Sequence, residues 1–338
     1  MGKIRFGEIM EKGLEGYFYC WVREPKDEGE VFRREDLSKY WIIDWEESKY
    51  TVFKKATLYR PPGLTTLSIR SKDIFKYGVF QLTARLPAWK DGPMLWFGFE
   101  VEDLFGGGVT HFLYKNGSLS AYAGAWSDEG PLVMAIPING LNLSLKRHTF
   151  TIRVHEHLAL WFLDSKLKAV AVLADGEKSQ VIHEGAPYSL GITALRPSPS
   201  MAILLDIDGG PLDKEWAWND LHPWQLRVLD GSPTPSLIIR LREYGKNTFL
   251  DRNIYEEKVV AHPVPALGVN TTFLFKASGK GALLIQAYTY GKGWTTIDTL
   301  QVADNLVKYT VKENPPFIRL VYEPKGAGKI EIAEAYIS

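Results

Sequence analysis

Two carboxylates, Glu100 and Glu102, stand two positions apart in the segment WFGFEVED, which begins at Trp96. Alternate side chains of a β-strand point to one face, so both carboxylates would share a face with Trp96. A carboxylate pair can hydrolyse a glycosidic bond when one attacks the sugar and the other donates a proton. The same pair could instead accept hydrogen bonds from sugar hydroxyls, or be a solvated pair with a structural role only.

A histidine and two aspartates are further chemical candidates. His111 follows the glycine turn 106–108 and could face Glu100 or Glu102 as an acid/base or metal pair, although a buried, hydrogen-bonded histidine is favoured. Asp206 and Asp208 precede two glycines with the density of a calcium loop but without EF-hand spacing, which favours a tight turn and leaves a structural calcium ion possible. No nucleotide, zinc or serine-hydrolase motif occurs, so we expect no other cofactor.

Aromatic residues make up 13% of the chain, which suits strands and also suits rings that stack on sugars. The candidate substrate-binding residues are Trp96, His111, Tyr114, Trp126, Trp89 and Trp218. Trp218 belongs to a tryptophan-rich stretch, 215–224, which could equally cap a sandwich or pack against a second domain. Tyr288, Tyr290 and Trp294 surround the turn 291–293 and form a second candidate surface, with a structural appendage as the alternative.

The elements that must position these residues are strands. Runs with period two, separated by turn residues such as Asn116-Gly117, predict an all-β chain. Strands are expected at 65–70, 77–86, 94–102, 110–114, 119–123, 149–154, 158–163, 169–174 and 201–207, and then at 271–276, 282–290, 295–302, 306–311, 318–323 and 329–337.

The polar, proline-rich stretch DGSPTP at 230–235 predicts a domain boundary. We expect a first β-sandwich at 31–229 and a smaller C-terminal β-sandwich at 236–338, of a size and strand pattern resembling carbohydrate-binding modules and galactose-binding-like domains. Residues 1–30 are an extension whose strand at 18–23 could pair with either domain.

Six segments occur in the order expected of one family. They are DLSKYW at 36–41, GLTTL at 63–67, FKYGVFQLTARLP at 75–87, GPMLWF at 92–97, RHTFTIR at 147–153 and LWFLDSK at 160–166. In this order they resemble the family 16 glycoside hydrolases of the concanavalin A-like lectin and glucanase superfamily. The resemblance covers roughly residues 33–229 and implies a jelly-roll sandwich with a carbohydrate site on its concave face.

The chain departs from that family at the catalytic strand. The family carries Glu-x-Asp-x-Glu or Glu-x-Asp-x-x-Glu there, with one glutamate as nucleophile and the last as acid/base. Here Leu104 and Phe105 stand where the second glutamate should be if Glu100 is the first, whereas Gly98 takes the nucleophile position if Glu102 is the last. In either alignment, one of the two catalytic glutamates is missing.

Charge and composition restrict the partners. Lys+Arg and Asp+Glu number 40 each, so no net field attracts nucleic acid or an anionic membrane. The first residues lack the apolar core of a signal peptide, which favours the cytoplasm, although a removed leader would leave the same sequence and an extracellular protein. Cys20 is the single cysteine and excludes an internal disulfide.

Three functions follow from these residues. The leading hypothesis is recognition of a polysaccharide or oligosaccharide without the standard catalytic motif. The second is a divergent retaining endo-glycosidase acting on a β-glucan or related polysaccharide through Glu100 and Glu102. The third is a structural or assembly protein, whose sign would be a large apolar patch on the concave face.

Overall fold

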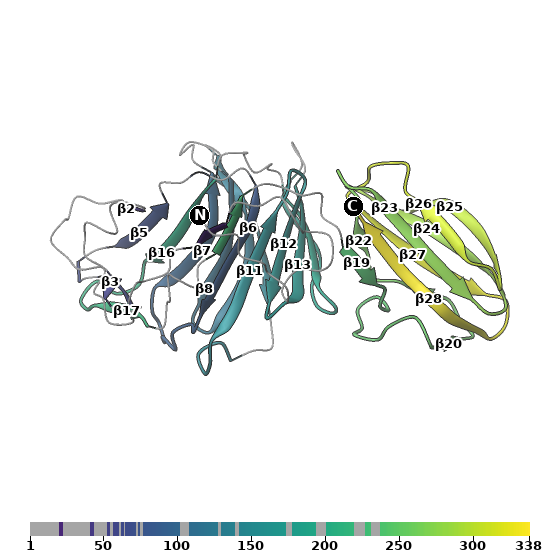
Figure 1. Cartoon of the computed structure of the whole chain (residues 1–338), viewed down its shortest axis with the longest axis horizontal. Coiled ribbons are helices and arrows are strands. Elements are labelled where there is room, and N and C mark those ends of the chain that lie inside the picture. Colours follow the sequence, from purple (N-terminus) through teal and green to yellow (C-terminus); the bar gives the residue numbers. More distant parts are fainter. Residues whose placement is uncertain are drawn as a thin grey trace.

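The computed structural model describes residues 20–22, 41–43, 53–54, 57–60, 62–63, 65–71, 74, 77–101, 108–127, 130–138, 142–173, 178–193, 201–219, 227–230 and 237–338. Every element named in these ranges is a β-strand (Figure 1). The prediction of an all-β protein is therefore confirmed. None of the described residues forms a helix that could cross a membrane.

A seven-stranded antiparallel sheet forms one layer of the first sandwich. Its strands, in spatial order, are β10 (Gly130–Ile138), β9 (Ser118–Ser127), β8 (Gly108–Lys115), β7 (Met94–Val101), β16 (Met201–Asp208), β5 (Thr66–Ser71) and β2 (Trp41–Ile43). The Asn116-Gly117 turn joins β8 to β9, as its sequence predicts, with both residues at positive φ. β7, which carries Trp96 and Glu100, lies in the middle of this sheet.

An eight-stranded sheet forms the other layer. Its order is β1 (Cys20–Val22), β18 (Arg227–Asp230), β6 (Gly78–Ala84), β11 (His148–Val154), β12 (Leu158–Leu163), β13 (Lys166–Leu173), β15 (Ser189–Thr193) and β14 (Gln180–His183). The strand near the N-terminus thus pairs with β18, on the first sandwich. A small sheet of β17 (Trp216–Trp218), β4 (Thr57–Arg60) and β3 (Phe53–Lys54) lies beside the two layers.

The core between the layers is aromatic. Phe97, Phe112 and Phe150 are fully buried, and their ring centroids lie 5.2 to 5.4 Å apart. Edge-to-face and offset contacts at such distances stabilise beyond the area they bury. Trp161 of the opposite layer donates a hydrogen bond from its indole Nε1 to the carbonyl of His111, at 2.9 Å. The core thereby fixes the backbone of β8 next to the candidate site.

The second sandwich has two five-stranded sheets, with residues alternating inward and outward as period two predicts. One contains β19 (Leu237–Arg240), β28 (Gly328–Ile337), β23 (Thr271–Ala277) and β26 (Val307–Thr310), with β20 (Ile254–Tyr255) on β28. The other contains β21 (Val259–Val260), β27 (Phe317–Pro324), β24 (Lys280–Thr289) and β25 (Gly293–Ala303), with β22 (Val264–Pro265) on β27.

The two sandwiches share an apolar seam. All six residues of β12 are buried, because Trp161 and its alternate neighbours face the first core, whereas Leu158, Leu160 and Phe162 belong to one cluster with the core of the second sandwich. The hydroxyl of Tyr188 donates across this seam to the carbonyl of Pro263, at 2.8 Å. In Figure 1, β12 and β13 occupy the side of the first sandwich that faces the second.

Candidate functional site

Alternation along β7 separates a core face from an outer face. Leu95, Phe97 and Phe99 are fully buried in the core, so Trp96 and Glu100 project from the opposite face of the seven-stranded sheet, where both are partly buried. We call this the outer face. The residues it receives from other strands follow from the strand register.

His111 lies at the centre of the outer face. It is 2% exposed, and burial lowers its pKa to about 3, so the imidazole is neutral at physiological pH. Neither ring nitrogen has a hydrogen-bond partner in the described part of the chain. A buried polar group left unsatisfied costs roughly 1–3 kcal/mol, which makes this ring a candidate for contact with a ligand.

Gly98 lies directly opposite His111 and makes room for the close approach of β7 and β8. Its φ is +153°, and a Cβ there would lie 2.4 Å from the carbonyl oxygen of Thr110 and 2.8 Å from the Cδ1 of Ile152. No side chain fits in that space. The glycine that takes a catalytic position in one register of the family resemblance is therefore required here by packing.

Two aromatic rings flank His111. The Trp96 ring meets the Tyr122 ring edge to face, with centroids 4.8 Å apart, and meets the His111 ring at 6.2 Å and 65°. Tyr122 pairs with His111 in the ladder between β8 and β9. Three strands thus contribute one ring each to a cluster that we call the outer-face triad: Trp96, His111 and Tyr122.

Carboxylates flank the triad on two sides. Glu100 lies opposite Val109 on β8 and Ala202 on β16, whereas Asp206 lies opposite Trp96. A four-residue offset along β16 separates Ala202 from Asp206, or about 13 Å at 3.3 Å per residue. This backbone offset is larger than the ~5–5.5 Å between the carboxyl groups of retaining glycosidases and the ~6.5–9.5 Å of inverting ones, which argues against Glu100 and Asp206 as a catalytic pair.

The predicted partner of Glu100 lies outside the described residues, as does any bulge at that end of β7: Glu102 has no described position. The favoured interpretation of His111, a buried histidine with a hydrogen bond, is right about burial, but neither ring nitrogen has a partner among the described residues. The alternative pairing of His111 with Glu100 is therefore not formed, and Gly98 lies opposite His111 in the ladder. Because Glu102 lies outside the described residues, its pairing with His111 stays a prediction.

At the possible calcium site, the structure shows what Asp208 contacts. Asp208 accepts a hydrogen bond from the Thr66 hydroxyl at 2.5 Å, and Arg60 holds the adjoining turn by donating to the carbonyls of Thr65, Gly209 and Pro211. In the ranges described, no three histidine, cysteine, aspartate or glutamate side chains gather as metal ligands. The contacts at Asp208 are those of a braced turn.

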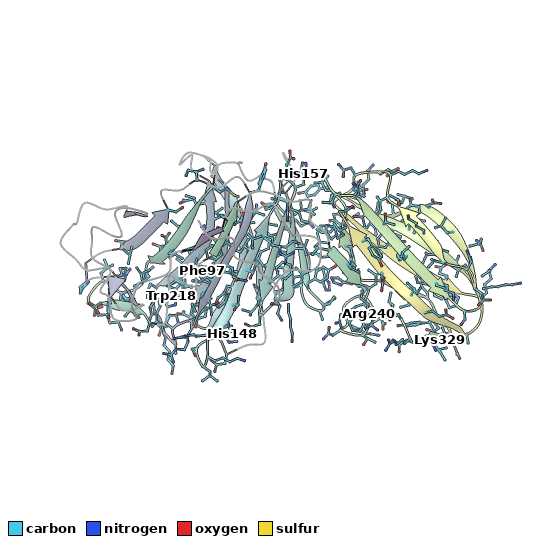
Figure 2. All side chains as sticks on the ribbon, in the orientation of Figure 1. Phe97, His148, His157, Trp218, Arg240 and Lys329 are labelled. Carbon is cyan, nitrogen blue, oxygen red and sulfur yellow. The ribbon has the colours of Figure 1, made fainter. Side chains whose placement is uncertain are left out.

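The prediction that Tyr114 and Trp218 bind substrate is wrong, because both side chains point into the core. Tyr114 lies opposite Leu95 on the core face and donates its hydroxyl to the carbonyl of Pro87 at 2.6 Å. Trp218 is fully buried, lies 5.5 Å from Phe97 and donates Nε1 to the carbonyl of Arg85 at 3.0 Å (Figure 2). Both were expected at a binding face because an aromatic residue with a polar tip suits either location.

The remaining first-domain candidates are less central. Trp89 is partly buried and packs edge to face on Trp216, with centroids 5.4 Å apart, beside the small sheet. Trp126 lies in β9 at a position of outer-face parity, and its side chain is outside the described set. Trp96 and His111 are thus the predicted residues that the structure brings together.

The second predicted surface, formed by Tyr288, Tyr290 and Trp294, differs from the open sugar-binding surface that the sequence suggested. Tyr288 is 8% exposed, and its ring packs against Trp294 with centroids 5.3 Å apart while its hydroxyl reaches Gln180 of the first sandwich. Arg319 lies 4.3 Å from the centre of the Trp294 ring. Tyr290 is partly buried against the core. Tyr288 therefore supports Trp294 at the seam and does not offer an open ring to a sugar.

Sequence reasoning missed Tyr122, although a signal for it was available. A two-residue turn at Asn116-Gly117 fixes the register of the flanking strands, so that paired positions sum to 233. His111 must then pair with Tyr122. The third ring of the triad was implied once the turn had been recognised.

Comparison with known proteins gives structural likenesses only. No family model matches the chain, and no curated protein matches it. Among solved structures, a Bacillus licheniformis β-glucanase is 10% identical with a TM-score of 0.39, over 65% of this chain and 100% of that one. A prokaryotic β-1,3-1,4-glucanase (lichenase) from a mouse hindgut metagenome is 11% identical with a TM-score of 0.40, over 63% and 98%.

A third similar structure is a Bacteroides ovatus mixed-linkage glucan family 16 protein in complex with the product G4G4G3G, 12% identical with a TM-score of 0.37, over 60% of this chain and 95% of that one. This third structure is named as a member of family 16, the family that the ordered segments resemble. The TM-scores of these structures are too low to support an argument. The β-sandwich fold is instead established by the two sheets of this chain.

Proposed function

We propose that the outer face of the seven-stranded sheet binds a polysaccharide or oligosaccharide without cleaving it. The observation that carries the proposal is the outer-face triad, in which two aromatic rings enclose a neutral histidine whose nitrogens lack partners among the described residues. Rings supply apolar area for the C–H face of a sugar, and a neutral imidazole can both donate to and accept from hydroxyls.

Carboxylates near the triad support recognition of hydroxyl groups. On the outer face Asp206 lies beside Trp96, and Glu100 lies four positions further along β7, a backbone offset that argues against the two-carboxylate mechanism. Each carboxylate can accept hydrogen bonds from a bound chain. A sugar bound over the triad would therefore have Asp206 beside it at Trp96 and Glu100 further along β7.

An assembly function has less support. The large hydrophobic side chains that are exposed in the described ranges are Ile74, Leu145, Leu212, Ile238, Tyr244, Ile254 and Leu306, and none belongs to a strand of the seven-stranded sheet. A face used for apolar protein contact would expose such residues together.

Binding is tested by affinity electrophoresis and calorimetry on a panel of β-glucans, xylans and mannans. Trp96→Ala should weaken binding about tenfold or more, equivalent to about 1.4 kcal/mol, because it removes the largest ring of the triad. Leu145→Ala is the matched control, since it removes an exposed apolar side chain outside these strands. Equal losses in the two variants, or no binding by the parent protein across the panel, would contradict the proposal.

A divergent retaining glycosidase is the second candidate, because Glu100 is a partly buried carboxylate on the outer face. Release of reducing ends from the same panel separates the two functions. Release that disappears in Glu100→Gln, while binding is retained, would establish the enzyme. Glu184→Gln, an exposed carboxylate on another part of the sandwich, controls for the loss of one negative charge.

A further inference from the structure

Arg319 occupies an unusual position at the seam between the sandwiches. It projects from β27, and its guanidinium lies 4.3 Å from the centre of the Trp294 ring and 5.8 Å from that of Tyr244. Its Nε donates to the Oε1 of Gln286 at 2.9 Å, and the Nε2 of Gln286 donates in turn to the Thr296 hydroxyl at 3.2 Å. The amide is thus oriented by Thr296 to hold one edge of the guanidinium.

The other edge of the guanidinium has no anionic partner. Within the described ranges, Arg319 forms no ion pair, and Gln286 is its sole hydrogen-bond acceptor. Arg240 of the same sandwich differs, because its Nε and Nη2 engage the Asp251 carboxylate at 2.7 to 2.9 Å. The guanidinium stacked on Trp294 therefore keeps N–H donors that are free among the described residues, and a guanidinium fork matches a planar carboxylate.

The surroundings of the arginine are neutral and suited to a sugar. Gln286 and Thr296 provide an amide and a hydroxyl, and Tyr244 is 37% exposed at the rim. An aromatic ring, a few convergent polar groups and one charge form the composition of a small-ligand site. Tyr288 and His183 complete the arrangement by linking Trp294 and Tyr244 to the first sandwich.

We propose that Arg319 binds the carboxylate of an acidic saccharide, such as a uronate unit of a polysaccharide, with Tyr244, Gln286 and Thr296 contacting the sugar. The site lies on the second sandwich and is separate from the outer-face triad. It gives the chain a second carbohydrate contact of a different charge class.

Calorimetry with tetragalacturonate and with its carboxyl-reduced, neutral counterpart tests this site. The parent protein should bind the acidic tetramer at least tenfold more tightly than the neutral one. Arg319→Met should abolish that preference, and Arg319→Lys should restore only part of it, because lysine keeps the charge but loses the fork. Lys308→Met is the control, since it removes an exposed positive charge from the other sheet of the same sandwich.

Several results would overturn the proposal: no binding of the acidic tetramer by the parent protein, equal binding of both tetramers, or unchanged binding by Arg319→Met. Inorganic sulfate that binds as tightly as the tetramer would overturn the assignment to a saccharide. If Arg319→Met unfolds, Gln286→Leu, which leaves the arginine in place, should reduce acidic binding several-fold. Trp96→Ala should leave this binding intact, so failure of the outer-face proposal is scored separately.

Discussion

Two buried histidines should make the stability of this protein fall steeply in mild acid. His111 lies in the outer-face triad and His262 at the seam, and the pKa of each is lowered to about 3. Burial is the cause for His111. For His262 burial acts first and nearby His183 second, against a smaller opposing contribution from the backbone of Tyr188.

The sign follows from proton linkage. In the unfolded chain both rings titrate near pH 6.5, whereas in the folded protein they stay neutral down to about pH 3. Between these values the unfolded state binds more protons, so the free energy of unfolding falls as the pH falls. From pH 7 to pH 5 each histidine should remove about 2 kcal/mol, and the two together about 4 kcal/mol, a large part of an ordinary domain's stability.

Urea unfolding at pH 7 and pH 5 measures the effect in the parent protein and in His111→Phe, His262→Phe and the double variant. Phenylalanine keeps an aromatic ring and removes the titration, so each single variant should lose about 2 kcal/mol less than the parent between the two pH values. His157→Gln, at a partly exposed histidine, is the control. A parent slope retained in the double variant, or titration of His111 in the folded protein near pH 6 by NMR, would refute the reasoning.

Other substitutions test packing and single hydrogen bonds, each by chemical denaturation. Gly98→Ala should lower the free energy of unfolding by about 2 to 3 kcal/mol, because its Cβ would collide with the Thr110 carbonyl. Gly63 also has a positive φ but has no described atom within 4 Å of the position that a Cβ would take, so Gly63→Ala should lower it by about 1 kcal/mol. Equal losses in the two variants would contradict the steric explanation. Tyr188→Phe should cost about 1 to 3 kcal/mol by leaving the Pro263 carbonyl without its donor, and Tyr336→Phe, whose hydroxyl contacts Glu334 near solvent, should cost less than about 0.5 kcal/mol; the reverse order would show that the seam bond contributes nothing. Trp218→Phe should destabilise by about 2 to 4 kcal/mol through lost core volume and the lost bond to Arg85, and a change below about 1 kcal/mol would return Trp218 to the candidate binding residues.

The strands could be predicted from the sequence because period two and turn residues are local signals. The segment expected at 158–163 coincides with β12, and that expected at 318–323 lies within β27. β10 was missed, since its sequence GPLVMAIPI contains two prolines, which weaken a strand prediction. Pro131 and Pro137 are tolerated there because β10 is at the edge of its sheet.

The face of the sheet from which a side chain projects was harder to predict than the strand to which the residue belongs. Trp96 and Tyr114 both lie on strands of one sheet, yet the register between β7 and β8 places Trp96 opposite Leu113 and Tyr114 opposite Leu95, on different faces. The sequence between these two strands, residues 102–107, offers no rule that relates length to register, unlike the two-residue turn Asn116-Gly117. The partners of Arg319 were beyond sequence reasoning altogether, because they come from strands and loops brought together only by the tertiary fold.

The two-sided burial of β12 bears on how the chain folds as it is synthesised. The first sandwich, complete in sequence by residue 230, displays Leu158, Leu160 and Phe162 to water until the strands at 237–338 have emerged and folded over them. At common translation rates that interval is roughly 5 to 20 s, long compared with the closing of a small domain. During this interval the nascent protein exposes these three apolar side chains and is prone to aggregate. Its yield in cells should therefore depend on chaperones that bind exposed apolar surface until the second sandwich covers it.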